Sequence, residues 1–138
     1  MKRTAHQALD AAGILAEDID IVIAGASGLQ SQDHAEALAL QDLLANNQQV
    51  SVTAIKGTLG ETYGASGLFQ TLAAVCMIDR GIVPPTAVKD AQRFTSPPFN
   101  GLLTEARTLS KSRQGTTLLL AQDLFGSTSA VVLRGYQR

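Results

Sequence analysis

Residues 19–28 read Ile19-Asp20-Ile21-Val22-Ile23-Ala24-Gly25-Ala26-Ser27-Gly28. Apart from Asp20, the first five side chains are β-branched and apolar, and they show no alternation of polar with apolar positions. Such a run predicts a strand buried on both faces, which is typical of a parallel sheet covered by helices. The strand runs into a loop of small residues and then into a predicted helix, so this stretch favours an α/β fold.

The rest of the chain continues this alternation of helix and strand. We expect further strands over residues 50–55, 101–104, 116–121 and 129–134, with Gly126 in the turn between the last two. The sequence therefore predicts one α/β domain over residues 1–138. Its sheet should be mixed, mostly parallel and of about five strands, with helices on both faces.

Capping signals predict where the first two helices begin. Thr4 with Gln7 fits a capping box, and Asp33 with Glu36 fits a second one that opens a helix reaching about Asn46. In the same manner, Gly13 is expected to end the first helix.

The third predicted helix is unusually apolar. It reaches Arg80, where Gly81 should end it, and between residues 68 and 78 only Gln70 and Thr71 are polar. A helix on one face of a small sheet normally turns a polar stripe towards water. We therefore expect its outer side to be covered by another copy, by another chain, or by the long segment 87–113.

Cys76, the only cysteine, lies within this apolar helix. A displaced nucleophile would be one interpretation, but a buried and inert core cysteine fits the surrounding residues better. A single cysteine also excludes an internal disulfide and a thiolate metal cage.

Composition excludes several classes of partner. The net charge is −1, from 11 basic and 12 acidic residues, and provides no field that would attract nucleic acid or an anionic membrane. The longest apolar run, residues 72–78, is far shorter than the roughly 20 residues that span a bilayer. No apolar stretch follows the charged residues at the start, as a signal peptide would require, so we expect a cytoplasmic protein.

Four segments form a recognisable series in one order and spacing from about Ala8 to Leu133. The first is the strand and loop over residues 21–28, with Asp33 and Glu36 behind it. The others are Lys56-Gly57-Thr58-Leu59-Gly60-Glu61-Thr62-Tyr63-Gly64-Ala65-Ser66-Gly67, Ile82-Val83-Pro84-Pro85-Thr86 and Phe125-Gly126-Ser127-Thr128-Ser129. This series resembles the C-terminal half of the ketosynthases, the thiolase-fold condensing enzymes of fatty-acid and polyketide assembly.

The resemblance implies where catalytic histidines would stand. The family has His-Gly-Thr-x-Thr followed by Asp-x-x-Glu, and then Lys-x-x-x-Gly-His-x-x-Gly-Ala-x-Gly. Counting back from Asp33 places Gly25 at the first histidine, and counting on from Lys56 places Glu61 at the second. The histidines that are present, His6 and His34, stand at neither position.

The chemistry of condensation depends on these positions. It needs a thiolate nucleophile, which the family carries in its other half, and hydrogen-bond donors aimed at the developing enolate oxygen. Gly25 has no side chain to donate, and an ionised Glu61 would repel the developing charge.

Losses of this kind are typical of chain length factors, the inactive partners of ketosynthases in iterative polyketide systems. The resemblance therefore implies a non-catalytic subunit that completes a heteromeric ketosynthase complex for polyketide or fatty-acid elongation and shapes its acyl pocket. The implied partners are an N-terminal ketosynthase-like half-chain, a catalytic ketosynthase, or both, with acyl carrier protein reached through the complex. No metal or cofactor is implied. The candidate pocket or loop residues are Gly25, Ser27, Lys56, Glu61 and Phe125.

Other interpretations stay open for single residues. Lys56 either pairs with Glu61 or lines an acyl pocket. Asp33 and Glu36, with His34 between them, suit a metal less well than they suit helix capping. For Gly25 we expect a positive φ or a close backbone approach, and for the segment 64–67 tight helix packing in preference to phosphate binding.

Two alternatives concern the whole chain. One is an autonomous homodimeric scaffold or acyl-ligand-binding module derived from a ketosynthase. The other is an enzyme that uses Glu61 as a general base, for which the sequence offers no second catalytic group.

Overall fold

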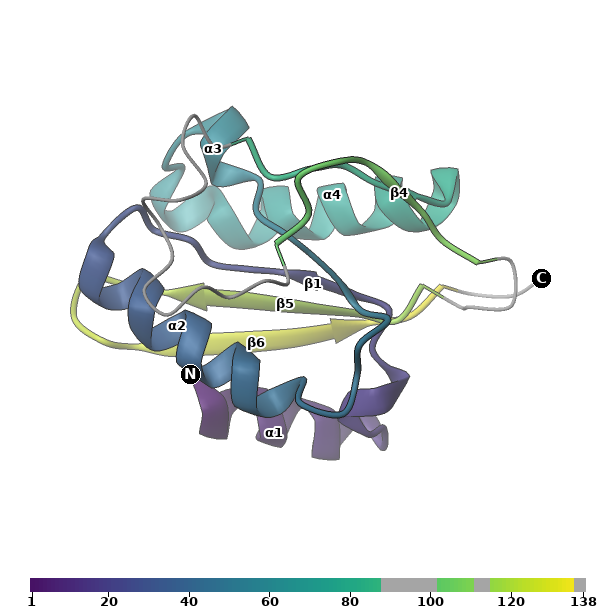
Figure 1. The fold of residues 1–138 in the computed structure, drawn as a ribbon. Helices are drawn as coiled ribbons and strands as arrows, with labels where there is room; N and C mark the ends of the chain where they lie inside the picture. Colours follow the sequence, from purple (N-terminus) through teal and green to yellow (C-terminus); the bar gives the residue numbers. More distant parts are fainter. Residues whose placement is uncertain (88–101, 111–114, 136–138) are drawn as a thin grey trace.

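The structure is a computed structural model and describes residues 1–87, 102–110 and 115–135 (Figure 1). The elements follow in the order α1 (Lys2–Ala12), the 3₁₀ turn η1 (Ala16–Asp18), β1 (Ile21–Ile23), α2 (Gln30–Leu43), β2 (Ser51–Thr53), α3 (Lys56–Leu59), the 3₁₀ turn η2 (Tyr63–Ala65), α4 (Ser66–Arg80), β3 (Ile82–Val83), β4 (Arg107–Thr108), β5 (Thr117–Gln122) and β6 (Thr128–Leu133).

The main sheet is mixed and mostly parallel, as predicted. Its strand order is β2-β1-β5-β6, with β1 parallel to β2 and to β5, and β6 antiparallel to β5. The strand expected over residues 101–104 is reduced to one parallel bridge between Val52 and Leu102, and Gly101 lies outside the described residues. A separate pair of short strands, β3 and β4, was not predicted.

Helices cover both faces of this sheet, with α1 and α2 on one side and α4 on the other (Figure 1). Side chains alternate between faces along a strand. Val22 of β1 therefore packs with residues of α1 and α2, whereas Ile21 and Ile23 pack with Ala74 and Met77 of α4. All three residues of β1 are completely buried, which explains why the strand is apolar at every position.

The C-terminal ends of the helices fit the predictions made from glycine, whereas their N-terminal ends do not fit the predicted capping boxes. Gly13 and Gly81 end α1 and α4 in the left-handed conformation, with φ of 64° and 65°. By contrast, α1 already begins at Lys2 without a side-chain cap, and the hydroxyl of Thr4 lies 2.6 Å from that of Thr128. The first capping box was therefore wrong, because Thr4 finds its partner on β6.

The second capping box was also wrong. α2 begins at Gln30, so Asp33 and Glu36 both lie inside the helix, and their carboxylates bind the preceding loop instead of the helix end. The helix ends at Leu43, three residues before the predicted end.

α4 has its polarity inverted relative to an ordinary surface helix. Its buried residues include Gln70, whose amide nitrogen donates to the carbonyl oxygens of Ala24 (3.3 Å) and Leu120 (2.9 Å). Its exposed residues include large apolar ones and Cys76. The prediction of a buried core cysteine was wrong, because the face of α4 on the sheet is formed by Gln70, Ala74 and Met77 and Cys76 points outward.

Asn47, just beyond α2, joins this helix to the start of β1. Its side chain is buried, and its amide nitrogen donates to the carbonyl oxygens of Ala16 (2.9 Å) and Ile19 (2.8 Å). Asn47 thus helps to hold the turn that leads into β1.

Replacing Asn47 with alanine should destabilise the chain by about 1–3 kcal/mol, because buried carbonyl groups lose their donor. Urea denaturation followed by circular dichroism measures this change. Asn46→Ala is the matched control, since Asn46 is the neighbouring residue and is exposed, and it should alter stability by less than about 0.5 kcal/mol. Equal losses in the two variants would contradict the role assigned to Asn47.

Candidate functional site

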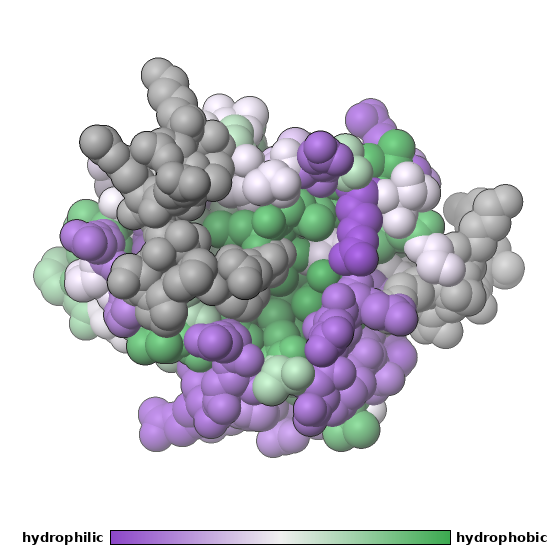
Figure 2. All heavy atoms as spheres, in the orientation of Figure 1, coloured by the Kyte–Doolittle hydropathy of each residue, from purple (hydrophilic) through white to green (hydrophobic). Residues whose placement is uncertain are grey.

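A cavity of about 370 Å³ opens where β1 and β2 end, beneath α2 and α3. Its walls are mostly small and apolar, and charged residues also line it. The apolar residues include Ala24, Ala26, Ala37, Leu40, Ala54 and Leu102, and the polar ones include Ser27, Asp33, Glu36, Lys56, Glu61 and Thr86. On the face drawn in Figure 2, hydrophobic residues gather in the middle of the molecule, above the hydrophilic outer surfaces of α1 and α2.

Glu36 holds the loop that follows β1. Its two carboxylate oxygens accept hydrogen bonds from the backbone N–H groups of Gly25 and Ala26, each at 2.8 Å. Burial raises the pKa of Glu36, and these two hydrogen bonds oppose the rise. Ala26 adopts a positive φ of 38°, which is uncommon for a residue other than glycine. The clamp by Glu36 thus fixes a backbone conformation that the sequence alone does not favour.

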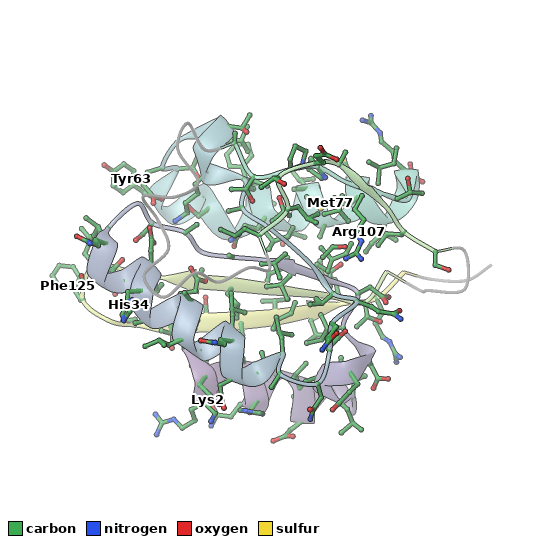
Figure 3. All side chains as sticks on the ribbon, in the orientation of Figure 1. Lys2, His34, Tyr63, Met77, Arg107 and Phe125 are labelled. Carbon is green, nitrogen blue, oxygen red and sulfur yellow. The ribbon has the colours of Figure 1, made fainter. Side chains whose placement is uncertain are left out.

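Asp33 fixes the second part of the same loop. One carboxylate oxygen accepts a hydrogen bond from the hydroxyl of Ser27, and the other accepts one from the backbone N–H of Gly28, both at 3.1 Å. Ser27 therefore lines the cavity with its hydroxyl already engaged. His34, between the two carboxylates in sequence, is exposed on α2 (Figure 3). In the described part of the chain, no three His, Cys, Asp or Glu side chains gather in a way that could hold a metal ion.

Lys56 and Glu61 form an ion pair, one of the two alternatives left open for Lys56, and Lys56 also lines the cavity. The ammonium nitrogen lies 2.8 Å from one carboxylate oxygen of Glu61, and the side chain of Lys56 is largely buried. The other oxygen of Glu61 accepts hydrogen bonds from the backbone N–H of Tyr63 (2.9 Å) and the hydroxyl of Ser66 (3.0 Å). The hydrogen bond from Lys56 holds the pKa of Glu61 below its usual range. Glu61 is therefore a charged, fully engaged carboxylate at the edge of the cavity.

Gly25 is buried behind the wall of the cavity. A β-carbon here would lie 3.2 Å from a carboxylate oxygen of Glu36 and 3.4 Å from the carbonyl oxygen of Leu120. The close approach predicted for Gly25 is therefore present, whereas the positive φ occurs at the next residue, Ala26. The tight packing expected around Gly64 and Gly67 was wrong, because a β-carbon at either glycine would meet no described atom within 4 Å.

Phe125 lies outside the cavity. It occupies the turn between β5 and β6, where it is 94% exposed, at the end of the molecule where Figure 3 labels it. The carboxylate of Asp123 accepts hydrogen bonds from the backbone N–H groups of Phe125 (2.8 Å) and Ser127 (2.9 Å) and fixes this turn.

Sequence reasoning missed three residues that build this region. Asp123 carries a readable signal, since aspartate three residues before Gly126 is typical of a tight turn. Thr86 accepts a hydrogen bond from the backbone N–H of Ala54 (3.1 Å) beside the cavity. Gln70 of α4 donates to the carbonyl oxygen just past β1 and to one within β5. The last two join segments that are distant in sequence, so no local pattern could reveal them.

Comparison with known proteins decides the family. Residues 1–89 match the family described as Beta-ketoacyl synthase, C-terminal domain. The chain belongs to this family. It is 38% identical over 136 residues to the Putative polyketide beta-ketoacyl synthase 2 of Streptomyces coelicolor, a match that covers 97% of this chain and 30% of that protein. It is 34% identical over 137 residues to the Tetracenomycin polyketide synthase ketoacyl synthase beta subunit of Streptomyces glaucescens, with 96% and 31% covered.

Solved structures agree on the thiolase-like ketosynthase fold. The chain matches the ishigamide ketosynthase/chain length factor with a TM-score of 0.82 and 25% identity, covering 99% of this chain and 32% of that one. A beta-ketoacyl synthase from Burkholderia phymatum gives a TM-score of 0.84 at 20% identity, with the same coverage. The family member described here thus spans about 30% of the length of the curated relatives it matches. No helix in residues 1–87, 102–110 or 115–135 is long and apolar enough to cross a membrane.

The raised pKa of Glu36 predicts how the stability of the chain depends on pH. Because the folded-state pKa exceeds the unfolded one, folding takes up a proton between these two values, and the contribution of Glu36 to stability declines as pH rises through that window. Glu36→Gln removes this dependence. At neutral pH it should also cost about 1–3 kcal/mol, because an amide cannot accept from both N–H groups.

Urea unfolding of both proteins across the acidic to neutral range tests this expectation. The deficit of Glu36→Gln should be largest at the acidic end of the window and should shrink as pH rises. Glu17→Gln, at an exposed glutamate, controls for loss of charge and should follow the original chain. A deficit that grows with pH would contradict the assignment.

Proposed function

We propose that this chain is the C-terminal part of a non-catalytic ketosynthase-like subunit, of the chain-length-factor kind, that serves polyketide assembly. The family membership and the relatives named as polyketide ketoacyl synthases support the polyketide role. The catalytic steps would then belong to a partner ketosynthase. In this proposal the chain forms a single domain, works in the cytoplasm, and meets acyl carrier protein only through the assembled complex.

The state of Glu61 is the observation that carries this proposal. Glu61 stands where the second ketosynthase histidine is expected, and both of its carboxylate oxygens are engaged by Lys56, Tyr63 and Ser66. An anion in this position cannot donate a hydrogen bond to a developing enolate oxygen. A pKa held low also disfavours a general base tuned to neutral pH, so the geometry does not favour the enzyme alternative.

The cavity supports a role in shaping an acyl pocket. It lies beside Gly25, its volume of about 370 Å³ falls in the range of small-molecule sites, and its walls are largely apolar. Among the proposed pocket residues, Ser27, Lys56 and Glu61 line this space, Gly25 lies directly behind it, and Phe125 lies outside it.

Glu61→Gln tests whether this chain takes part in catalysis. In the complex with its catalytic ketosynthase, this variant should retain the condensation rate to within about twofold, because the substitution leaves the proposed catalytic set in the partner untouched. Replacing the nucleophilic cysteine of the partner with alanine should abolish the same rate. A large loss with Glu61→Gln in a complex of normal composition would contradict the non-catalytic assignment.

Ala37→Phe tests the pocket. The added ring projects into the cavity from α2 and should shift the product distribution towards shorter chains, measured by mass spectrometry of the complex's products. Ala11→Phe places the same ring on the exposed surface of α1 and should leave the distribution unchanged. Identical distributions in the two variants would contradict pocket shaping by this chain.

A homodimeric acyl-binding module is the second candidate. The observation in its favour is the row of exposed apolar residues on α4, which a second copy of the chain could cover. Light scattering of the purified chain gives its oligomeric state and so helps to distinguish the two candidates. A stable, well-folded homodimer that also binds a fatty acid would favour the module.

A further inference from the structure

Thr86 places a buried hydroxyl on the wall of the cavity. The residue is only 9% exposed, and its hydroxyl oxygen accepts a hydrogen bond from the backbone N–H of Ala54 at 3.1 Å. A hydroxyl also has a proton of its own to donate. Within residues 1–87, 102–110 and 115–135, that proton has no acceptor. A buried donor of this kind is suited to an acceptor atom of a molecule inside the cavity.

Lys56 supplies the positive charge of the cavity, and this charge is already matched. Its ammonium donates to Glu61 at 2.8 Å, and its charge also acts on Glu36. An ammonium has three N–H donors, so two of them are left without an acceptor in the described part of the chain. Lys56 can therefore donate a hydrogen bond to a ligand, but it has no uncompensated charge to offer.

The two segments that carry these donors contact each other. A β-carbon on Gly57, the neighbour of Lys56, would clash with the carbonyl oxygen of Ala87, the neighbour of Thr86. The backbone N–H of Thr86 donates to the carbonyl oxygen of Leu103 at 2.9 Å, which holds the second segment in place. Both donors thus belong to one packed part of the cavity wall.

Carboxyl groups outnumber this single lysine. Among the described residues that line the cavity, Asp33, Glu36 and Glu61 are acidic and Lys56 alone is basic. The three acidic side chains already accept hydrogen bonds from groups of the chain. Between apolar walls the repulsion of like charges is screened less than in water. A ligand that brings a further negative charge is therefore opposed, whereas an uncharged ligand is not.

We infer that the cavity selects uncharged chains that carry a carbonyl oxygen and excludes carboxylates. The hydroxyl of Thr86 donates to the carbonyl oxygen, Lys56 provides a second donor, and the pairing of Lys56 with Glu61 denies an anion its partner. The apolar wall contacts the hydrocarbon part of the ligand. Ketones, amides and thioesters share this chemistry. The inference rests on the proposed function and specifies the class of ligand that its pocket accepts.

Two probes of one chain length test this selection. 2-Octanone carries a neutral carbonyl oxygen, and octanoate is a carboxylate with the same number of carbons. Titration of the chain with each probe, followed by heteronuclear NMR, gives the affinity and, from the amide signals that shift, the place of binding. 2-Octanone should bind about tenfold more tightly than octanoate, because the cavity repels the charge. The shifted signals should include those of Ala26, Ala54 and Thr86.

Thr86→Val tests the hydroxyl. Valine has nearly the same shape without a donor, so the affinity for 2-octanone should fall about tenfold, whereas Thr86→Ser keeps the hydroxyl and should retain the affinity to within about twofold. Thr86→Val also removes the acceptor of the Ala54 N–H, so circular dichroism verifies its fold. Equal affinities in the valine and serine variants would contradict the role assigned to Thr86.

Glu61→Gln tests the exclusion of anions through a gain of binding. The substitution leaves the ammonium of Lys56 without its carboxylate partner, so the affinity for octanoate should rise about tenfold, while that for 2-octanone should change by less than about twofold. Glu17→Gln removes the same charge at an exposed glutamate outside the cavity and should leave both affinities unchanged. A folded Glu61→Gln chain that binds octanoate no better would overturn the role of the pair.

The outcomes separate this inference from the proposed function. Equal binding of the two probes in the cavity, or tighter binding of octanoate, would overturn the inference and leave the proposed pocket in place. Absence of either probe from the cavity would also overturn the inference. The product distribution of Ala37→Phe then decides separately whether the chain shapes the pocket.

Discussion

The buried carboxylate of Glu36 is the interaction on which the arrangement of the site depends. It binds the backbone N–H groups of Gly25 and Ala26 and thereby ties α2 to the end of the central strand. The positive φ of Ala26 and the position of Gly25 beside the cavity wall both depend on that tie. Because the group is desolvated, its charge depends on these two hydrogen bonds and, to a smaller extent, on the charge of Lys56.

Around this clamp, two further carboxylates, those of Asp33 and Glu61, already have partners within the chain. Asp33 engages Ser27 and Gly28, and Glu61 engages Lys56, Tyr63 and Ser66. A site whose charges are satisfied internally is suited to shaping space and poorly suited to moving protons. Because these carboxylates are already engaged within the chain, the geometry of the cavity supports the non-catalytic role proposed for it.

The sequence predicts the elements whose signals are local. We could infer the doubly buried β1 and the glycine ends of α1 and α4, because each depends on neighbouring residues. For the same reason the Lys56–Glu61 pair could be named, as one of two alternatives. The partner of a side chain could not be inferred when it lies in another part of the chain. The Asp33–Glu36 spacing fits a capping box and a loop clamp equally well, and only the tertiary structure distinguishes them.

The same limit applies to α4. Its apolar composition predicted that its outer side is covered, but it did not reveal which side faces the sheet. Gln70 faces inward because the carbonyl oxygens of Ala24 and Leu120 need a donor there. Cys76 consequently points outward, which reverses the expected assignment.

The turn between β5 and β6 has a consequence of its own. Asp123 accepts hydrogen bonds from two backbone N–H groups of the turn, so the backbone that carries Phe125 is already ordered. The ring is nevertheless almost entirely in water. An aromatic side chain on a rigid support gives up little conformational entropy when another surface covers it, so almost all of the apolar area it buries counts towards binding.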